Sequence, residues 1–298
     1  MTALQYIIDG IALGAVYAVV AVGIGLVFGV LRLVNFAYGQ LVMAGAYTLA
    51  YTSDWPVLWS IVVCFAVVIA LSLVLERAVF RPLRSYSPTV MLVTTFAISF
   101  VLQSAALIVD LRDGTEGEPA SSLTDLNRAI TVLGTDVRKV TIVAVVVAAI
   151  TLTLLAALLG RTSMGLRMRA AAMDFRTARM LGVDANQVIG FAVILSGVHA
   201  AIVAVILTVQ QPLVTHTFAL NETILVLVGV VVGGIDRLWT ATLGGFAIGF
   251  ASQLINGALP TEKTIYLPSL VFALVIVVLL VKPAGLFVRG RSSVVDRV

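Results

Sequence analysis

The chain has 298 residues, of which 60% are apolar and only 11% are charged. Soluble domains carry roughly 25% charged residues, so this composition excludes an ordinary soluble domain and indicates an integral membrane protein. The net charge of +4 is modest. Basic residues in such a protein more often mark cytoplasmic loops than a nucleic-acid surface. We therefore expect one transmembrane domain over residues 1–298, in contact with membrane lipid and without a nucleic-acid partner.

Charge-free apolar intervals recur along the whole chain. They predict an all-α polytopic helix bundle of about eight or nine hydrophobic segments, some of them short or broken. The first segment lacks the basic flank of a signal peptide, so we expect a retained helix. At about 1.5 Å per residue, the first six can each cross ~30 Å of hydrocarbon. In chain order the segments are Gly10–Leu31, Leu33–Ser53, Trp55–Leu75, Ser85–Val109, Thr141–Gly160, Val188–Thr215, Thr223–Ile235, Leu238–Thr261 and Thr264–Val281.

Lys and Arg are divided unevenly between the two sides that alternating segments define. One side holds 14 of the 19 basic residues, and the other holds ten of the 15 acidic residues. Because cytoplasmic loops are enriched in Lys and Arg, we expect the first side, with residues 161–187 and the tail 282–298, to be cytoplasmic. The N-terminus is then external, unless one segment is re-entrant. The external loop 110–139 is either a docking surface for a partner or a solvated, partly ordered connector.

The polar groups inside the segments are neutral. Proton-coupled pumps usually carry charged residues in the membrane, whereas the middles of these segments carry none. Thr95, Ser99 and Gln103 recur at every fourth position and share one helix face. This polar stripe either lines a passage or bonds to a neighbouring helix. Our candidates for the translocation path are Asn35, Tyr38, Gln40, Thr95, Ser99 and Gln103.

The motifs of an enzyme are missing from the sequence. It has no G-x-x-x-x-G-K-[ST] phosphate loop, and no Ser/His/acid arrangement stands out. The single cysteine, Cys64, excludes an internal disulfide. His199 and His216 have no spacing that suggests a metal site. We expect no catalytic residue, metal or cofactor on this chain, so any ATP that drives it binds to another chain.

The most informative stretch lies on the Arg-rich side, at 165–186, and reads G-L-R-M-R-A-A-A-M-D-F-R-T-A-R-M-L-G-V-D-A-N. Arg, Ala, Met and Leu are good helix formers, and Gly182 suits the left-handed residue that ends a helix. Asp184 or Asn186 can cap the helix that follows. The stretch predicts a short Ala-rich helix that docks on another protein. An amphipathic helix on the membrane surface fits less well, since large apolar residues are few.

This stretch resembles the coupling region of ABC importer permeases, an Ala-rich helix followed by Gly. The segment Val34–Gln40, V-N-F-A-Y-G-Q, is similar to the N-F-A-H-G-E signature of the branched-chain amino acid ABC transporter permeases, the shorter Liv-type membrane subunit family. Tyr38 and Gln40 depart from that signature, where His and Glu are usual. Leu-Gly-Val at 181–183, the glycine-rich stretches 232–235 and 243–249, and Lys282–Phe287 also resemble this family, so the resemblance covers about residues 5 to 290 in order.

The resemblance implies a permease subunit of an ATP-driven importer in a bacterial cytoplasmic (inner) membrane. Such a subunit pairs with a second homologous permease, two ATP-binding subunits and an extracytoplasmic substrate-binding protein. The implied cargo is branched-chain or related amino acids, and the alternatives are urea, short amides or aromatic acids. A stand-alone channel or secondary carrier is the alternative of another class. The residues implied in coupling to the ATPase are Arg169, Ala171, Ala172, Asp174, Arg176, Arg179 and Gly182.

Overall fold

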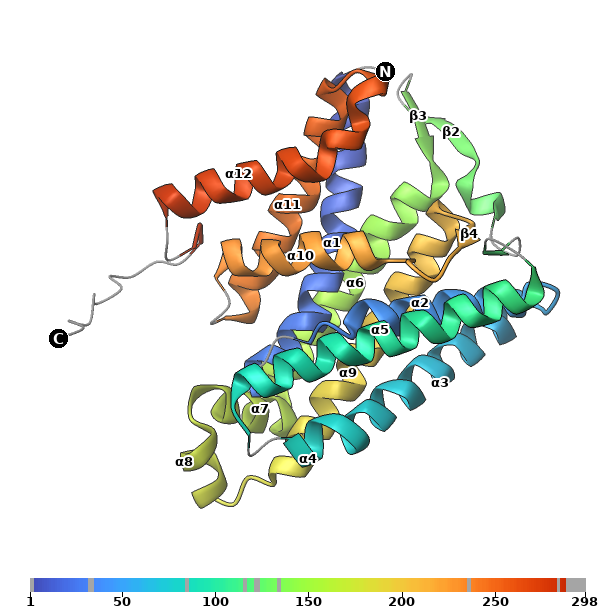
Figure 1. The fold of residues 1–298 in the computed structure, drawn as a ribbon. Helices are drawn as coiled ribbons and strands as arrows, with labels where there is room; N and C mark the ends of the chain where they lie inside the picture. The colour runs from blue at the N-terminus through green and yellow to red at the C-terminus, as the bar shows by residue number, and fades with distance from the viewer. Residues whose placement is uncertain are drawn as a thin grey trace.

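The computed structural model of the chain is a bundle of long helices with two small antiparallel strand pairs (Figure 1). Seven helices in the described residues are long and apolar enough to cross a membrane. This confirms the expected all-α polytopic membrane protein. The structure describes residues 3–31, 35–83, 86–114, 117–120, 124–132, 135–234, 237–282 and 285–287, so most of the tail expected at 282–298 lies outside it.

The seven spans follow the predicted segments with shifted ends. The first helix begins at Ala3, seven residues before the expected Gly10, and includes Asp9. The third span is extended by a π-helical turn η1, Glu76–Phe80, and a last turn α4, Arg81–Leu83. A 3₁₀ turn η3, Thr261–Tyr266, leads into the final span. The long helices are α1 Ala3–Leu31, α3 Val57–Leu75, α5 Pro88–Asp113, α6 Lys139–Arg161, α9 Ala185–Gln210, α11 Leu238–Ala258 and α12 Leu267–Val281.

The core of the bundle forms around α1. In the most apolar stretch of α1, 83% of the residues are buried, against 11% in that of α12. Small residues allow helix backbones to approach one another closely inside a membrane. On the α1–α11 crossing, a Cβ added to Gly249 would lie 2.8 Å from the Cα of Gly14. Between α10 and α11, a Cβ on Gly244 would lie 2.1 Å from the carbonyl oxygen of Gly229. These two contacts join α1, α10 and α11 into one closely packed unit.

Two helices are too short to cross the hydrocarbon alone. They are α2, Tyr38–Tyr51, and α10, Leu220–Gly233, each of 14 residues or about 21 Å. The first residue of α2 packs on α1, since a Cβ on Gly23 would lie 2.3 Å from the Tyr38 hydroxyl. Gly23 is about 12 Å along α1 from its last residue, Leu31. Helix α2 therefore starts inside the bundle and does not fill the full-length span expected at 33–53.

The segments that connect the long helices differ in structure between the two ends of the bundle (Figure 1). At one end, a short helix pair follows α6, α7 Ser163–Met173 and α8 Phe175–Met180. At the opposite end, α5 runs to Asp113 and stops at Gly114, where φ is +70°, so the expected external loop starts a few residues after residue 110. The described part of that loop contains the 3₁₀ turn η2 Thr124–Asn127 and strands β1 Glu118–Pro119, β2 Ala129–Val132 and β3 Thr135–Arg138. Strand β2 pairs with β3, and β1 pairs with β4, Leu213–Val214, all antiparallel.

Candidate functional site

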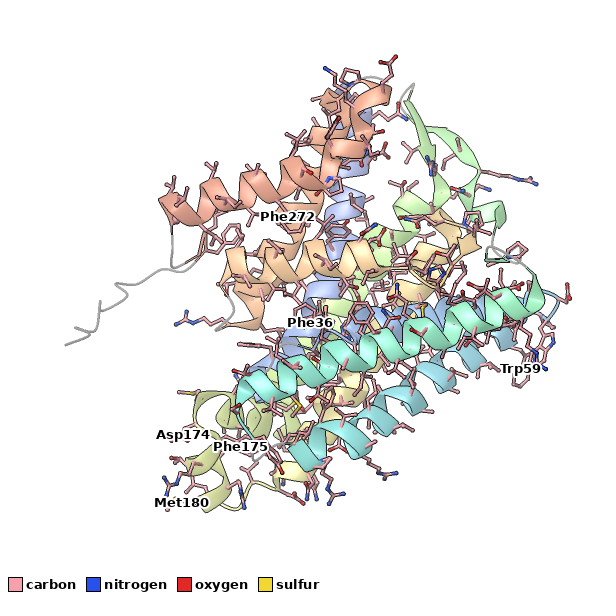
Figure 2. All side chains as sticks on the ribbon, in the orientation of Figure 1. Phe36, Trp59, Asp174, Phe175, Met180 and Phe272 are labelled. Carbon is pink, nitrogen blue, oxygen red and sulfur yellow. The ribbon has the colours of Figure 1, made fainter. Side chains whose placement is uncertain are left out.

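A cavity of about 340 Å³ lies between α5 and α10, beside the chain that leads into α2. Its walls are mostly apolar and aromatic. Phe96 packs edge-on against both Phe36 and Phe100, with ring centroids 5.7 and 4.9 Å apart. Figure 2 labels Phe36 on the side of the bundle where α5 and α10 run past each other. The cavity is lined by Phe36, Phe96, Ser99, Phe100, Gln103, Leu220, Thr223, Ile224 and Leu227.

The polar stripe of α5 points both into this cavity and toward α2. Ser99 and Gln103 line the cavity. Ser99 also accepts a hydrogen bond from Nε2 of Gln40 at 3.1 Å, and the hydroxyl of Thr95 accepts one from the backbone N–H of Phe36 at 3.5 Å. Of the two alternatives that the sequence left open, the hydrogen bond to a neighbouring helix is confirmed at Ser99, whose partner Gln40 belongs to α2. A role of these residues in translocation stays a prediction.

The other three path candidates lie behind the cavity wall. Asn35 is 3% exposed, and its Oδ1 accepts a hydrogen bond from the N–H of Ala37 at 3.0 Å, which closes the turn before α2. Tyr38 is fully buried against α1. Gln40 is 1% exposed and reaches Ser99. Within the described residues, the hydroxyl of Tyr38 and Oε1 of Gln40 have no hydrogen-bond partner. These residues place the start of α2 and do not line the cavity.

The first turns of the two short helices meet next to the cavity. A Cβ on Gly39 of α2 would lie 2.7 Å from the hydroxyl oxygen of Thr223, which lines the cavity from α10. The N-terminus of a helix carries unpaired N–H groups and a partial positive charge. In transporters, helices that are broken inside the membrane turn such ends toward anionic groups of the substrate. Here Tyr38 and Gln40 already donate their N–H groups to the carbonyls of Asn35 and Ala37, and the first turn of α10 carries Glu222. The helix dipoles therefore favour a carboxylate on this side of the cavity, while the acidic Glu222 opposes it.

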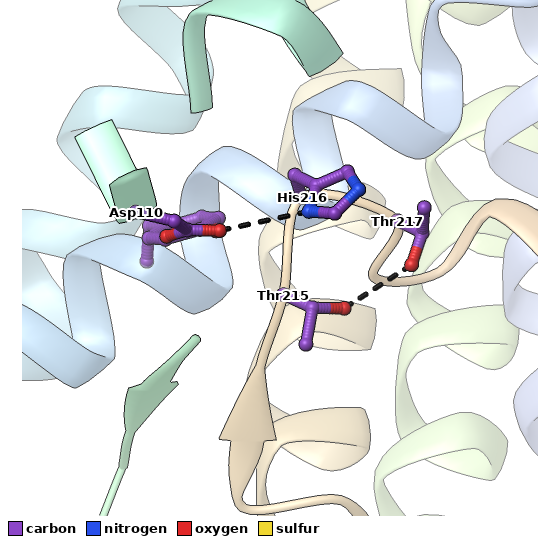
Figure 3. A network of polar contacts seen from close by, with 5 residues as sticks. Asp110, Thr215, His216 and Thr217 are labelled. Carbon is purple, nitrogen blue, oxygen red and sulfur yellow. Dashed lines mark hydrogen bonds and ion pairs between the residues drawn. The ribbon is translucent and has the colours of Figure 1, made fainter. Parts of the chain in front are cut away.

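A second polar cluster lies at the end of the bundle opposite α7 and α8. Asp110 of α5 is 2% exposed, and the hydroxyl of Tyr47 lies 2.8 and 2.7 Å from its two carboxylate oxygens. Nδ1 of His216 is 3.7 Å from Oδ2 of the same carboxylate (Figure 3). Close by, the hydroxyls of Thr215 and Thr217 are 3.2 Å apart. This cluster is not evident from the sequence, in which Asp110 only marks the end of an apolar segment.

The Arg-rich stretch forms two helices where one was expected. Thr162 caps α7 by accepting a hydrogen bond from the N–H of Gly165 at 3.0 Å. At Asp174 the backbone is extended, and the side chain caps α8 by accepting from the N–H groups of Arg176 at 2.9 Å and Thr177 at 3.1 Å. A hydrogen bond from the Thr177 hydroxyl, followed by these backbone bonds, lowers the pKa of the Asp174 carboxyl. Asp174 therefore breaks the expected single helix and begins the second one.

The end of the stretch follows the prediction from local residues. Gly182 has a left-handed φ of +85°, and its N–H donates to the carbonyl of Arg179 at 3.0 Å. Asp184 then caps α9 by accepting from the N–H of Asn186 at 2.8 Å. Of the expected coupling residues, Ala171 is buried and Ala172 is half-buried. The others, which are exposed, are Arg169, Asp174, Arg176, Arg179 and Gly182.

Helix α8 protrudes from the bundle and presents apolar side chains to its surroundings (Figure 2). Met180 is 82% exposed and Leu181 80% exposed. A depression of about 560 Å³ on α8 is lined by Phe175, Arg176, Arg179 and Met180. Exposed apolar residues with a basic rim are typical of a surface that binds another protein.

The bundle of long apolar helices, with two short helices starting at an internal cavity, defines a polytopic membrane protein of the transporter class. Residues 6–280 match the family model described as the permease component of the branched-chain amino acid transport system. The chain belongs to this family.

Curated relatives cover nearly the whole chain. The high-affinity branched-chain amino acid transport system permease protein LivH of Escherichia coli K12 is 27% identical over 98% of this chain and 96% of its own length. The corresponding protein BraD of Pseudomonas aeruginosa is 26% identical over 98% of this chain and 97% of its own length. A probable LivH of Methanocaldococcus jannaschii is 26% identical over 89% of this chain and 86% of its own length. No solved structure matches the chain.

Proposed function

We propose that this chain is the permease subunit of an ATP-driven importer of branched-chain amino acids, in a bacterial cytoplasmic membrane. It forms half of the translocation path, a second homologous permease forms the other half, and two ATP-binding subunits supply the energy. An extracytoplasmic binding protein delivers the substrate. The observation that carries the proposal is the cavity between α5 and α10, because its two kinds of wall match the two parts of such a substrate.

The walls of the cavity separate apolar from polar contacts. Phe96, Phe100 and Leu227 offer an apolar surface to an aliphatic side chain, while Ser99 and Gln103 offer neutral hydrogen-bonding groups. The dipoles of the adjacent first turns of α2 and α10 would attract a carboxylate. Urea and short amides lack both the carboxylate and the apolar group, so the cavity fits them less well. The names of the relatives agree with this choice of substrate.

The coupling role is proposed for α7 and α8. These helices form the end of the bundle expected to be cytoplasmic, and α8 carries the exposed Met180 together with Arg176 and Arg179. An ATP-binding subunit would hold this surface and move it during its cycle. The orientation rests on the excess of Lys and Arg on this side, and on the same ground we expect the C-terminus in the cytoplasm.

The experiment is leucine uptake into proteoliposomes that contain both permeases, both ATP-binding subunits and the binding protein. We expect uptake only with ATP inside. Leu227→Trp should block uptake because the indole fills the cavity. Val231→Trp, one turn later on α10 at a residue that is 42% exposed and does not line the cavity, is the matched control. Uptake by this chain alone, or equal uptake by both variants, would contradict the proposal.

A further inference from the structure

A separate groove runs along α1 and shares no lining residue with the cavity of the proposed path. Its widest part, about 370 Å³, lies where α1, α7 and α11 meet, at the end of the bundle that carries α8. A narrower part of about 230 Å³ continues between α6 and α11. Leu159 and Leu238 line both parts, so the two are directly adjacent.

The narrow part of the groove is apolar. Val22, Leu152 and Leu155 line its narrow part. The hydroxyl of Thr242 there donates to the carbonyl of Leu238 at 2.7 Å, within its own helix, and so is not available to a ligand. A polar solute would find no partner in this part of the groove among these residues, whereas a hydrocarbon chain would be well accommodated.

The length of the groove corresponds to one leaflet. From Val22 to Val30, the lining residues span eight positions of α1, or about 12 Å. Half of a hydrocarbon core of ~30 Å is about 15 Å. The groove therefore accommodates an acyl chain from the leaflet next to α7 and α8, and it stops near the middle of the bilayer.

Two arginines from different elements lie at the wide end of the groove. Arg169 comes from α7, and Arg237 precedes α11. Both are exposed, and neither guanidinium makes a hydrogen bond or ion pair within the part of the chain that the structure describes. Trp239 follows at 72% exposure on the wall of the groove. Tryptophan is enriched where the hydrocarbon meets the headgroups, which places both arginines at headgroup depth.

We propose that this groove binds one anionic phospholipid, with its acyl chain between α6 and α11 and its phosphate between Arg169 and Arg237. Basic pockets between membrane helices on the cytoplasmic side bind anionic headgroups, and guanidinium groups hydrogen-bond to phosphate in pairs. The bound lipid would connect α7 of the coupling surface to the start of α11. The site itself does not depend on the proposed substrate.

Gly29 provides a direct test. It lines the wide part of the groove, and a Cβ built on it meets no atom within 4 Å. Gly29→Leu should therefore fill the groove without displacing a neighbouring helix. Gly190 of α9 is equally open and lies outside the groove, so Gly190→Leu is the matched control.

The first measurement is native mass spectrometry of the whole transporter, stripped of lipid and titrated with phosphatidylglycerol or phosphatidylcholine. We expect one phosphatidylglycerol bound preferentially, lost in Gly29→Leu and kept in Gly190→Leu. Arg237→Gln should weaken it about fivefold, the effect of one basic residue near an anionic lipid. Equal binding of the two lipids, or unchanged binding in Gly29→Leu, would overturn the proposal.

The second measurement identifies the occupant in native membranes. A photoreactive phenylalanine analogue in place of Trp239 should cross-link to lipid in the assembled transporter. A cross-link to another subunit would mean that a protein helix covers the groove, and would also overturn the proposal. Loss of leucine uptake is not used as a readout, so failure here is distinguishable from failure of the transport proposal.

Discussion

Substitution of Gly182 separates the backbone requirement of the stretch 165–186 from its side-chain contacts. A Cβ at this position meets no atom within 4 Å, so a substitution causes no steric clash with the rest of the protein. Its φ of +85°, however, is one that L residues adopt only at a cost of roughly 1–2 kcal/mol. Such a cost changes the equilibrium of the turn by about 5- to 30-fold.

Three variants should therefore form a graded series. Gly182→Asn should be mild because Asn tolerates the left-handed region, and Gly182→Ala should show the full conformational cost. Gly182→Pro should be most severe. Proline fixes φ near −65° and lacks the N–H that Gly182 donates to Arg179, so the turn cannot form. We expect the coupling of ATP hydrolysis to leucine uptake to fall in the order wild type, Asn, Ala, Pro.

The assay measures ATP hydrolysis and leucine uptake in the same proteoliposomes, so that coupling is their ratio. Hydrogen exchange at the N–H of Val183, which donates to the carbonyl of Ala178 at 3.0 Å, reports the turn itself. Gly160→Ala is the matched control, because Gly160 is also open but lies in the last turn of α6. If Gly182→Pro assembles and couples normally, or if Ala has the same effect at both positions, the reasoning is wrong.

Three further predictions concern other parts of the chain. Because hydrogen bonds lower the pKa of Asp174, its cap on α8 is present at neutral pH and is lost as the pH falls through that lowered pKa. A spin label on α8 should gain mobility in this acidic range, whereas in Asp174→Asn its mobility should not change with pH. Tyr47→Phe removes the hydroxyl that donates to the buried Asp110, so thermal unfolding in detergent should show a loss of about 1.5–3 kcal/mol, absent when Asp110 is already Leu. Gly244→Val should prevent α10 from packing on α11, seen as loss of the folded monomer on size-exclusion chromatography, since its Cβ would meet Gly229; a folded variant would contradict that contact.

The long helices could be predicted from the sequence because their length is set by the hydrocarbon. Each apolar run long enough to cross the membrane has few alternatives to a helix, since lipid cannot satisfy backbone hydrogen bonds. The start of α2 was not predictable in this way. Asn35 and Ala37 form a buried turn within an apolar run, and only the contact of Tyr38 with Gly23 shows that the helix begins inside the bundle.

The candidate sites also divide into local features, which the sequence predicts, and contacts between distant residues, which it does not. Gly182 and Asp184 were predicted correctly because turn and cap chemistry depend on neighbours in the chain. The break at Asp174 had a local signal as well, a capping residue within a run of helix formers, but good helix propensity on both sides hid it. Asp110 was missed because its partner Tyr47 is 63 residues away and only tertiary structure brings the two together.

The contacts between helices also indicate where the cavity can change shape. Helices α2 and α5 are joined by two side-chain hydrogen bonds, from Gln40 to Ser99 and from Tyr47 to Asp110. Helices α10 and α11 are held together by the close backbone contact of Gly229 with Gly244. Across the cavity between these two pairs, the facing groups are mostly apolar, such as Phe100 on α5. Apolar surfaces slide past one another without breaking hydrogen bonds, as in the shear motions of packed helices. Because the first turns of α2 and α10 are in close contact at Gly39 and Thr223, relative movement of α5 and α10 would be largest at the end of the cavity away from that contact.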